Sequence, residues 1–178
     1  TQGVSSAASD VYKRQKKSGS DDQWLYLPAL KRVKRIASSN QAGPFMGSEF
    51  AYEDISSQEL EKYTYKYLRN EAYNGFDCFV VEYDPVDRKS GYSKQIVWID
   101  TKEYRSHKIE FYDRKESLLK TLKYKGYSKY NDKFWRADVF EMENHQTGKR
   151  TVLEFDDWKF QTGLTAKDFN KKSLKKVR

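Results

Sequence analysis

The feature that most constrains the fold is an alternation of apolar and polar residues that recurs between residues 62 and 160. Runs such as residues 76–83 and 118–127 are separated by turn-forming pairs such as Asn74-Gly75 and Asn131-Asp132. A period of two residues is typical of strands that bury one face, and these pairs are typical of hairpin turns. The sequence therefore predicts a meander of about six or seven antiparallel strands.

The stretch before this meander is more mixed. Residues 24–27 predict a short aromatic strand that ends at Pro28, because proline lacks the N–H that a ladder needs. Residues 30–36 space their apolar side chains by three, which fits either a helical turn or a strand. Residues 38–61, called the insert, begin as a loop and predict one or two short helices. An open sheet needs a cover, so we expect the insert to lie over one face.

The formal net charge of +8 is concentrated at the two ends of the chain. Residues 1–20 hold four bases and one acid and residues 162–178 hold six bases and one acid, so residues 21–161 are neutral. A neutral middle argues against a basic face for nucleic acid. We expect residues 1–20 to be disordered, with their first 15 residues resembling a non-native leader. We expect residues 171–178 to be a basic tail, either solvated or in peripheral contact with an anionic membrane.

The sequence offers little for metal or redox chemistry. Cys78 is the single cysteine, which excludes an intramolecular disulfide and a cysteine-based zinc site. It lies in an apolar run, so we expect it to be a small buried hydrophobic residue. Two histidines are too few for a histidine cage, and no apolar run reaches the length of about 18 residues that a membrane helix needs. We expect no cofactor and no metal.

Catalytic motifs are weak in this sequence. Ser106 and His107 are adjacent, so on a strand they point to opposite faces and cannot pair. No G-x-S-x-G elbow is present, and His145 lies in a stretch with turn composition. The paired acids Glu53-Asp54 and Asp156-Asp157 are typical of solvated edges. We therefore expect no catalytic residues.

Aromatic residues make up 16% of the chain and recur in the predicted strands and the insert. A sheet that is wide enough to curl can enclose an apolar ligand, and the insert carries Phe45, Met46 and Phe50. Methionine and aromatic side chains suit adaptable contacts with acyl chains. The same residues would equally well form an ordinary core, and the pattern alone leaves the two interpretations open.

Two long strings resemble a known family. Residues 22–36, DQWLYLPALKRVKRI, and residues 45–55, FMGSEFAYEDI, are similar to outer-membrane lipoprotein-sorting proteins of the LolA-like group. Residues 91–94, 97–100 and 118–122 fit the same group more loosely. The resemblance covers about residues 19–174.

The resemblance implies a fold that is mainly β, of the α+β type. It is an open, curved antiparallel half-barrel over residues 21–170, with short helices covering its concave face. It also implies the periplasm of a diderm bacterium and a non-enzymatic carrier of lipid or lipoprotein acyl chains, with an inner-membrane transporter as a further partner. The family has a signal peptide and further strands before the Trp24 motif, so we expect the half-barrel here to be incomplete at its N-terminus.

We expect an apolar cleft between the sheet and the insert, which would bind acyl chains by burying apolar surface at about 0.8 kcal/mol per CH₂. The residues expected to line this cleft are Trp24, Tyr26, Phe45, Met46, Phe50, Tyr65, Trp98 and Phe111. One alternative is a protein-binding accessory module of an envelope transporter, which would need an exposed apolar patch. A lipid esterase is another, and it would need a serine or an acid within reach of His107 or His145.

Overall fold

The computed structural model describes residues 11–14, 22–27, 30–37, 40–56, 59–165 and 168. The chain divides into two compact units, which are taken separately below. The smaller unit joins Thr1–Gln41 to Gln161–Arg178, and the larger unit is Ala42–Phe160.

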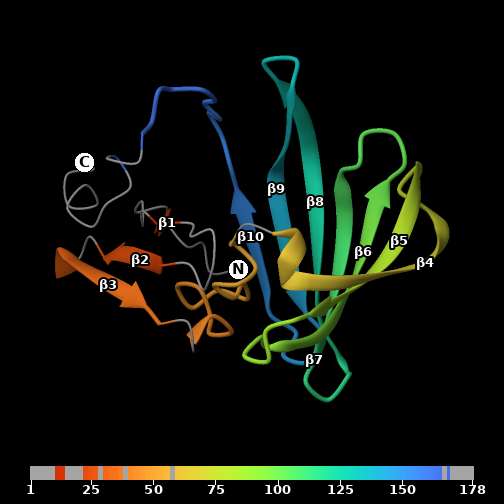
Figure 1. Ribbon diagram of the computed structural model, residues 1–178, viewed down its shortest axis with the longest axis horizontal. Coiled ribbons are helices and arrows are strands. Elements are labelled where there is room, and N and C mark those ends of the chain that lie inside the picture. The colour runs from red at the N-terminus through yellow and green to blue at the C-terminus, as the bar shows by residue number, and fades with distance from the viewer. Residues whose placement is uncertain are drawn as a thin grey trace. The chain divides into compact units, whose positions relative to one another are not determined.

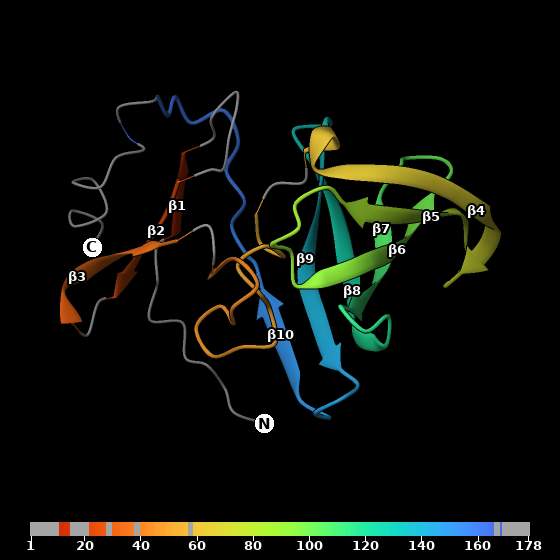
Figure 2. The same ribbon diagram turned by 60° about the horizontal axis from the view of Figure 1, so that its bottom comes forward.

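The larger unit is built on one antiparallel sheet of seven strands, in the order β10-β9-β8-β7-β6-β5-β4 (Figure 1). The strands are β4 (Tyr63–Tyr73), β5 (Phe76–Pro85), β6 (Tyr92–Asp100), β7 (Ser106–Asp113), β8 (Leu118–Tyr130), β9 (Phe134–Asn144) and β10 (Arg150–Glu154). Every strand pairs with its neighbours in the sequence, so the predicted meander is confirmed. The sheet curls from β10 round to β4 without closing into a barrel (Figure 2).

The hairpin turns follow from their residues. Asn74 and Gly75 have φ angles of 48° and 82°, and Asn131 and Asp132 have φ angles of 49° and 53°. Two successive positive φ angles match the right-handed twist of the flanking strands, and asparagine, aspartate and glycine adopt them at low cost. These pairs therefore set the β4–β5 and β8–β9 hairpins as the sequence predicted.

A β-bulge changes the face to which the residues of β4 point. Tyr67 pairs with Val81, but Arg69 pairs with Val80, so the register shifts by one residue at Leu68. Because side chains alternate along a strand, Tyr65 and Tyr67 point to one face of the sheet, and Arg69 and the odd-numbered residues after it point to the other.

Each face of the sheet carries its own apolar cluster. The inner face, defined here as the face that the insert covers, holds the main core. Its fully packed members are Phe50, Tyr92, Val97, Ile109, Phe111, Leu122 and Met142. The outer face holds a smaller cluster of Cys78, Val80, Ile96 and Trp98. Phe50, from the insert, is only 1% exposed, which shows how closely the insert packs on the inner face.

The prediction of short helices over this face is wrong. Residues 42–56 of the insert form turns with one isolated β-bridge, between Pro44 and Ala51. Met46 and Gly47 have φ angles of 52° and 73°, which no right-handed helix can contain. Ser48 Oγ accepts the N–H of Phe50 as a helix cap would, but the chain then turns back on itself. Further along, only Leu60–Lys62 is helical, as a single 3₁₀ turn, and residues 57–58 lie outside the described residues.

The smaller unit contains a three-stranded antiparallel sheet in the order β1-β2-β3. Its strands are β1 (Val11–Arg14), β2 (Asp22–Leu27) and β3 (Arg32–Ile36). The aromatic strand predicted at residues 24–27 is therefore confirmed, and residues 32–36 are a strand and not a helical turn. Of residues 1–20, only β1 is described, so the expected disorder stays a prediction. The basic tail lies outside the described residues.

Candidate functional site

The insert is held on the inner face first by aromatic packing. Phe50 and Phe111 are 1% and 2% exposed and belong to the same cluster, and Phe45 packs against it. The rings of Phe45 and Tyr52 meet edge to face, with their centroids 5.6 Å apart. Three of the predicted site residues, Phe45, Phe50 and Phe111, are thus brought together.

A buried polar network also fastens the insert to the sheet. Lys120 Nζ, on β8, lies 2.7 Å from Asp54 Oδ2 and donates to the carbonyl of Glu49 at 2.9 Å. The hydroxyl of Tyr92 donates to Asp54 Oδ1 at 2.6 Å. Asn144 Nδ2 donates to Glu49 Oε2 at 2.7 Å. The motif at residues 45–55 therefore supplies both the aromatic side chains that pack on the inner face and the acids that attach the insert to β6, β8 and β9.

Glu53 makes a second attachment beside this network. Its carboxylate accepts hydrogen bonds from Ser90 Oγ and Gly91 N, both at 2.9 Å. Burial raises the pKa of Glu53, and the hydrogen bonds from Gly91 and Ser90 offset part of that rise. The pKa of Tyr92 is raised well above its usual value by burial and by the nearby charge of Asp54. This side of the inner face is therefore acidic as well as aromatic.

One row of side chains crosses the whole inner face. The register pairs Tyr65 with Tyr83, Tyr83 with Gln95, Gln95 with Phe111, Phe111 with Lys120 and Lys120 with Asn144. The insert bonds to the Lys120 and Asn144 end of this row. At the other end, Tyr65 is 44% exposed.

Three tyrosine rings gather at that exposed end and define a tyrosine cluster of Tyr63, Tyr65 and Tyr83. The Tyr65 and Tyr83 rings meet edge to face at 4.6 Å, and the Tyr63 ring lies 5.7 Å from Tyr83. Burial, followed by the neighbouring tyrosines, raises the pKa of Tyr83 to about 12. The cluster therefore presents neutral phenol groups to any bound molecule. Tyr65 was a predicted site residue; Tyr63 could have been found from the same period of two, whereas Tyr83 is placed beside it only by the register of β4 and β5.

An aromatic ladder continues the inner face along β8 and β9. The rings of Tyr124 and Phe140 meet at 4.8 Å, and Phe155 lies 4.8 Å from Phe140. Trp158 stacks on Phe155 at 5.4 Å, and Phe160 stacks on Phe134 at 4.7 Å. The segment after β10 thus adds rings to the ladder, although it lies within residues 62–160, where alternation predicted strands.

The other predicted site residues lie elsewhere. Trp98 is 3% exposed on the outer face, and its indole N–H donates to Glu71 Oε1 at 2.9 Å. Met46 is 40% exposed in the insert. Trp24 and Tyr26 lie on β2 of the smaller unit. Among the six predicted residues of the larger unit, the structure therefore does not gather Met46 and Trp98 with the others.

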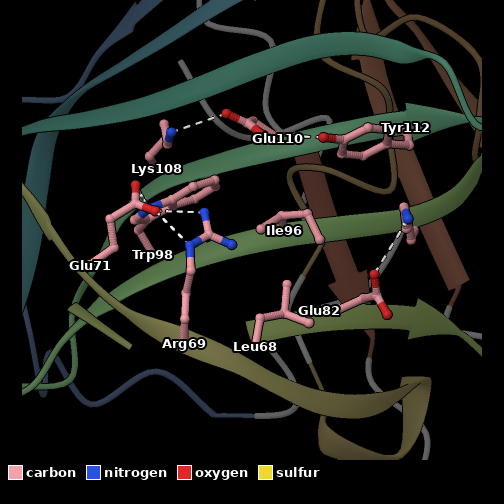
Figure 3. A pocket seen from close by; sticks show the side chains of 10 residues that line it. Leu68, Arg69, Glu71, Glu82, Ile96, Trp98, Lys108, Glu110 and Tyr112 are labelled. Atoms are coloured by element: carbon pink, nitrogen blue, oxygen red, sulfur yellow. Dashed lines mark hydrogen bonds and ion pairs between the residues drawn. The ribbon is translucent and has the colours of Figure 1, made fainter. Parts of the chain in front are cut away.

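The outer face carries a charged hollow of about 460 Å³ (Figure 3). Its lining includes three cations, Arg69, Lys94 and Lys108, and three carboxylates, Glu71, Glu82 and Glu110. Each cation has one of these carboxylates as its partner, at 2.5 to 3.4 Å. Stripping water from so many charges is costly, so the hollow is a poor place for an acyl chain.

An esterase would need a histidine bonded to both an acid and a hydroxyl group, and among the described residues each histidine is bonded to one of the two. His107 Nε2 lies 3.0 Å from Asp100 Oδ2, and His145 Nε2 lies 2.7 Å from Thr121 Oγ1. Within the described part of the chain, no hydroxyl group is bonded to His107 and no acid to His145. Asp100 instead organises the turn between β6 and β7.

The described residues contain no group of three or more potential metal ligands. Cys78 is buried, and burial raises the pKa of its thiol, as expected for a small core residue. No helix in the described ranges combines the length and the hydropathy needed to cross a membrane.

Comparison with solved structures identifies the family. A candidate outer membrane lipoprotein-sorting protein domain from Vibrio parahaemolyticus is 60% identical to the chain, with a TM-score of 0.87. The match covers 92% of this chain and 69% of that one. The chain belongs to the LolA-like outer-membrane lipoprotein-sorting family. The resemblance carried by residues 22–36 and 45–55 is thereby confirmed.

Two further structures support membership of the lipoprotein-sorting family. A DUF1329 family protein from Desulfovibrio piger is 28% identical, with a TM-score of 0.81 over 92% of this chain and 69% of that one. A LolA superfamily protein from Nitrosomonas europaea is 27% identical, with a TM-score of 0.68 over 85% of this chain and 67% of that one. The family model described as "-like: Uncharacterized protein" matches residues 5–176. No curated protein matches the sequence.

Proposed function

We propose that the protein is a periplasmic, non-enzymatic carrier that binds the acyl chains of lipids or lipoproteins on the inner face of its curved sheet. The observation that carries this proposal is that aromatic side chains gather at two places on that face, in the tyrosine cluster and in the ladder along β8 and β9. The 60% identical relative, a candidate lipoprotein-sorting domain, supports the same cargo and the same compartment.

The binding free energy follows from burial of the chain. About sixteen methylenes at about 0.8 kcal/mol each supply about 13 kcal/mol, and an association cost of about 5 kcal/mol leaves about 8 kcal/mol, the free energy of a micromolar complex. The inner face offers aromatic rings for this purpose, and its acids are already held, Asp54 by Lys120 and Glu53 by Ser90 and Gly91. The ligand therefore needs no ionic group for its affinity.

The route of entry follows from how the insert is attached. Opening the insert would separate Lys120 from Asp54 and return the buried ring of Phe50 to water, and exposing such a side chain alone costs about 1.5–3 kcal/mol. Entry beside the exposed Tyr65 leaves that pair intact. We therefore place the acyl chain next to the tyrosine cluster, with the insert staying docked.

The predicted contact residues take different parts in this proposal. Tyr65 contacts the ligand directly, whereas Phe45, Phe50 and Phe111 form the packed floor beneath the insert. The remaining four, Trp24, Tyr26, Met46 and Trp98, stay predictions.

Native mass spectrometry and displacement of a fluorescent fatty-acid probe test the proposal. The protein is expected to carry bound lipid and to bind the probe in the micromolar range. Tyr65→Ala, combined with Tyr83→Ala, should weaken probe binding about tenfold or more, because it removes two ring walls. Tyr104→Ala is the matched control, because Tyr104 is 72% exposed in the turn between β6 and β7. A lipid-free mass together with no probe binding would overturn the proposal.

One observation favours a second candidate, a docking module for a protein of the envelope, such as an inner-membrane transporter. Leu60, Tyr65 and Tyr67 are 76%, 44% and 59% exposed in and just before the edge strand β4. Exposed apolar side chains at one edge are typical of an interaction site. Leu60→Ser distinguishes the two candidates, because Leu60 precedes β4 and is the most exposed of the three, so its loss should weaken partner capture but leave lipid binding unchanged.

A further inference from the structure

Gln95 is a buried amide in the middle of the inner face, and it is 3% exposed. Its Nε2 donates to the hydroxyl of Tyr63 at 3.3 Å, but its Oε1 is buried without a hydrogen-bond partner among the residues that the structure describes. A buried acceptor without a donor is costly, and such groups are rare in folded proteins. The position of this acceptor therefore indicates a missing donor.

The surroundings show where such a donor would come from. In the register, Gln95 lies between Tyr83 on β5 and Phe111 on β7. It therefore stands where the insert-covered half of the inner face meets the tyrosine cluster. A molecule that entered beside Tyr65 would meet the ring of Tyr83 first and then the amide of Gln95.

The electrostatics of this position select the kind of polar group. Burial raises the pKa of Tyr63, and the charges of Glu53 and Asp54 raise it further. The charge of Asp54 is offset by Lys120, whereas the carboxylate of Glu53, which accepts from the neutral donors of Ser90 and Gly91, disfavours an anion nearby. Gln95 Oε1 can only accept a hydrogen bond. The group that fits is therefore neutral and carries an O–H or N–H.

We propose that Gln95 Oε1 accepts a hydrogen bond from the polar end of the bound lipid, so that the site selects neutral acyl compounds with a hydroxyl or amide donor over ionised fatty acids. This inference rests on the proposed function and names the ligand class of that site. The tyrosine rings hold the first methylenes of the chain, while the donor reaches the amide behind them.

Three ligands with the same chain test this selection. They are 1-monooleoylglycerol, which has hydroxyl donors, methyl oleate, which has none, and oleate, which is an anion at pH 8. Displacement of a fluorescent probe should give a Kd for monooleoylglycerol about tenfold lower than for the other two. Gln95→Met keeps the length of the side chain and removes the acceptor, so it should reduce the preference over methyl oleate to about twofold without weakening methyl oleate. The discrimination against oleate, which comes from the nearby carboxylate of Glu53, should persist.

Gln146→Met is the matched control. Gln146 lies in the turn between β9 and β10, where its amide is exposed and bonds to Asp113, so the preference should stay unchanged. Should Gln95→Met lose its folded circular-dichroism spectrum, the ranking of the three ligands by the unchanged protein decides.

The outcomes separate this inference from the function beneath it. Equal binding of all three ligands would overturn the role of Gln95 and leave the carrier function standing, with a water molecule as the donor. Preference for oleate would overturn it as well. Binding of none of the three would overturn both.

Discussion

The ammonium group of Lys120 lies 2.7 Å from a carboxylate oxygen of Asp54, and the two side chains are only 5% and 1% exposed. The pair joins β8 to the insert across 66 residues of sequence. The rings of Tyr92 and Phe111 flank the ammonium, with centroids 5.2 and 5.3 Å away. The charge of Lys120 is thus enclosed by one acid, one carbonyl and two ring faces.

Lys120→Met should destabilise the protein by about 3–5 kcal/mol, because it leaves the carboxylate of Asp54 buried without its cation. Urea denaturation followed by tryptophan fluorescence measures this loss. Lys125→Met is the control on the same strand, since Lys125 is 55% exposed in its pair with Glu141. That substitution should cost no more than about 1 kcal/mol. Equal losses of stability for the two variants would contradict this role of the buried Lys120–Asp54 pair.

Gly91 permits the close approach of the insert to β6. A Cβ at this position would lie 2.9 Å from the Cβ of Ala42 and 3.1 Å from Glu53 Oε1. Gly91→Ala should therefore cost about 1–3 kcal/mol through overpacking. Adding Ala42→Gly returns the space of one methyl group, so the double variant should recover part of the loss in the same urea titration. A double variant no more stable than Gly91→Ala would argue against this contact.

The strands of the larger unit could be predicted because their signal is local. Alternation over residues 76–83 and the Asn74-Gly75 pair each determine their own element. The insert could not be predicted in this way. Its residues have helical composition near Ser48. However, the carboxylate of Asp54 accepts hydrogen bonds from the N–H of Ala51 and from Lys120, 66 residues away in the sequence, and these bonds outweigh the local preference for a helix.

The site was harder to predict than the fold, because alternation does not carry the choice of face from one strand to the next. Trp98 and Phe111 were expected in one cleft, yet Trp98 pairs with Lys108 on the outer face and Phe111 pairs with Gln95 on the inner face. Gln95 carries no signal at all in the sequence. Only the register places its amide among the rings.

The free energy of unfolding should depend on pH through the carboxyl group of Asp100. Burial raises the pKa of this carboxyl group. Hydrogen bonds from the backbone N–H of Glu103 and from the side chains of Arg105 and His107 lower it by more, so that the pKa lies well below its usual value. The unfolded chain therefore binds the proton more readily, with a pKa of about 3.9. The stabilisation from Asp100 is complete above that pH and is lost as the pH falls through it and below.

Asp100→Asn removes this dependence. The difference in unfolding free energy between the unchanged protein and the variant should be large at pH 7. It should shrink by about 1 kcal/mol by pH 3, as measured by urea denaturation at each pH. A difference that stays constant from pH 7 to pH 3 would exclude the proposed role of Asp100.

Trp158 tests the aromatic ladder. Its indole N–H is buried and has no partner in the described part of the chain, while its ring stacks between Phe155 and Phe160. Trp158→Phe keeps a ring in the stack and removes the unpaired donor, so it should change the free energy of unfolding by less than about 1 kcal/mol. Trp158→Ala removes the ring and should cost about 2–3 kcal/mol, less than the value for a fully buried aromatic residue. Trp135→Phe is the matched control, because it loses the hydrogen bond of 2.8 Å to Glu103, and it should cost more than Trp158→Phe. The opposite order would show that the indole N–H of Trp158 has a partner in solution.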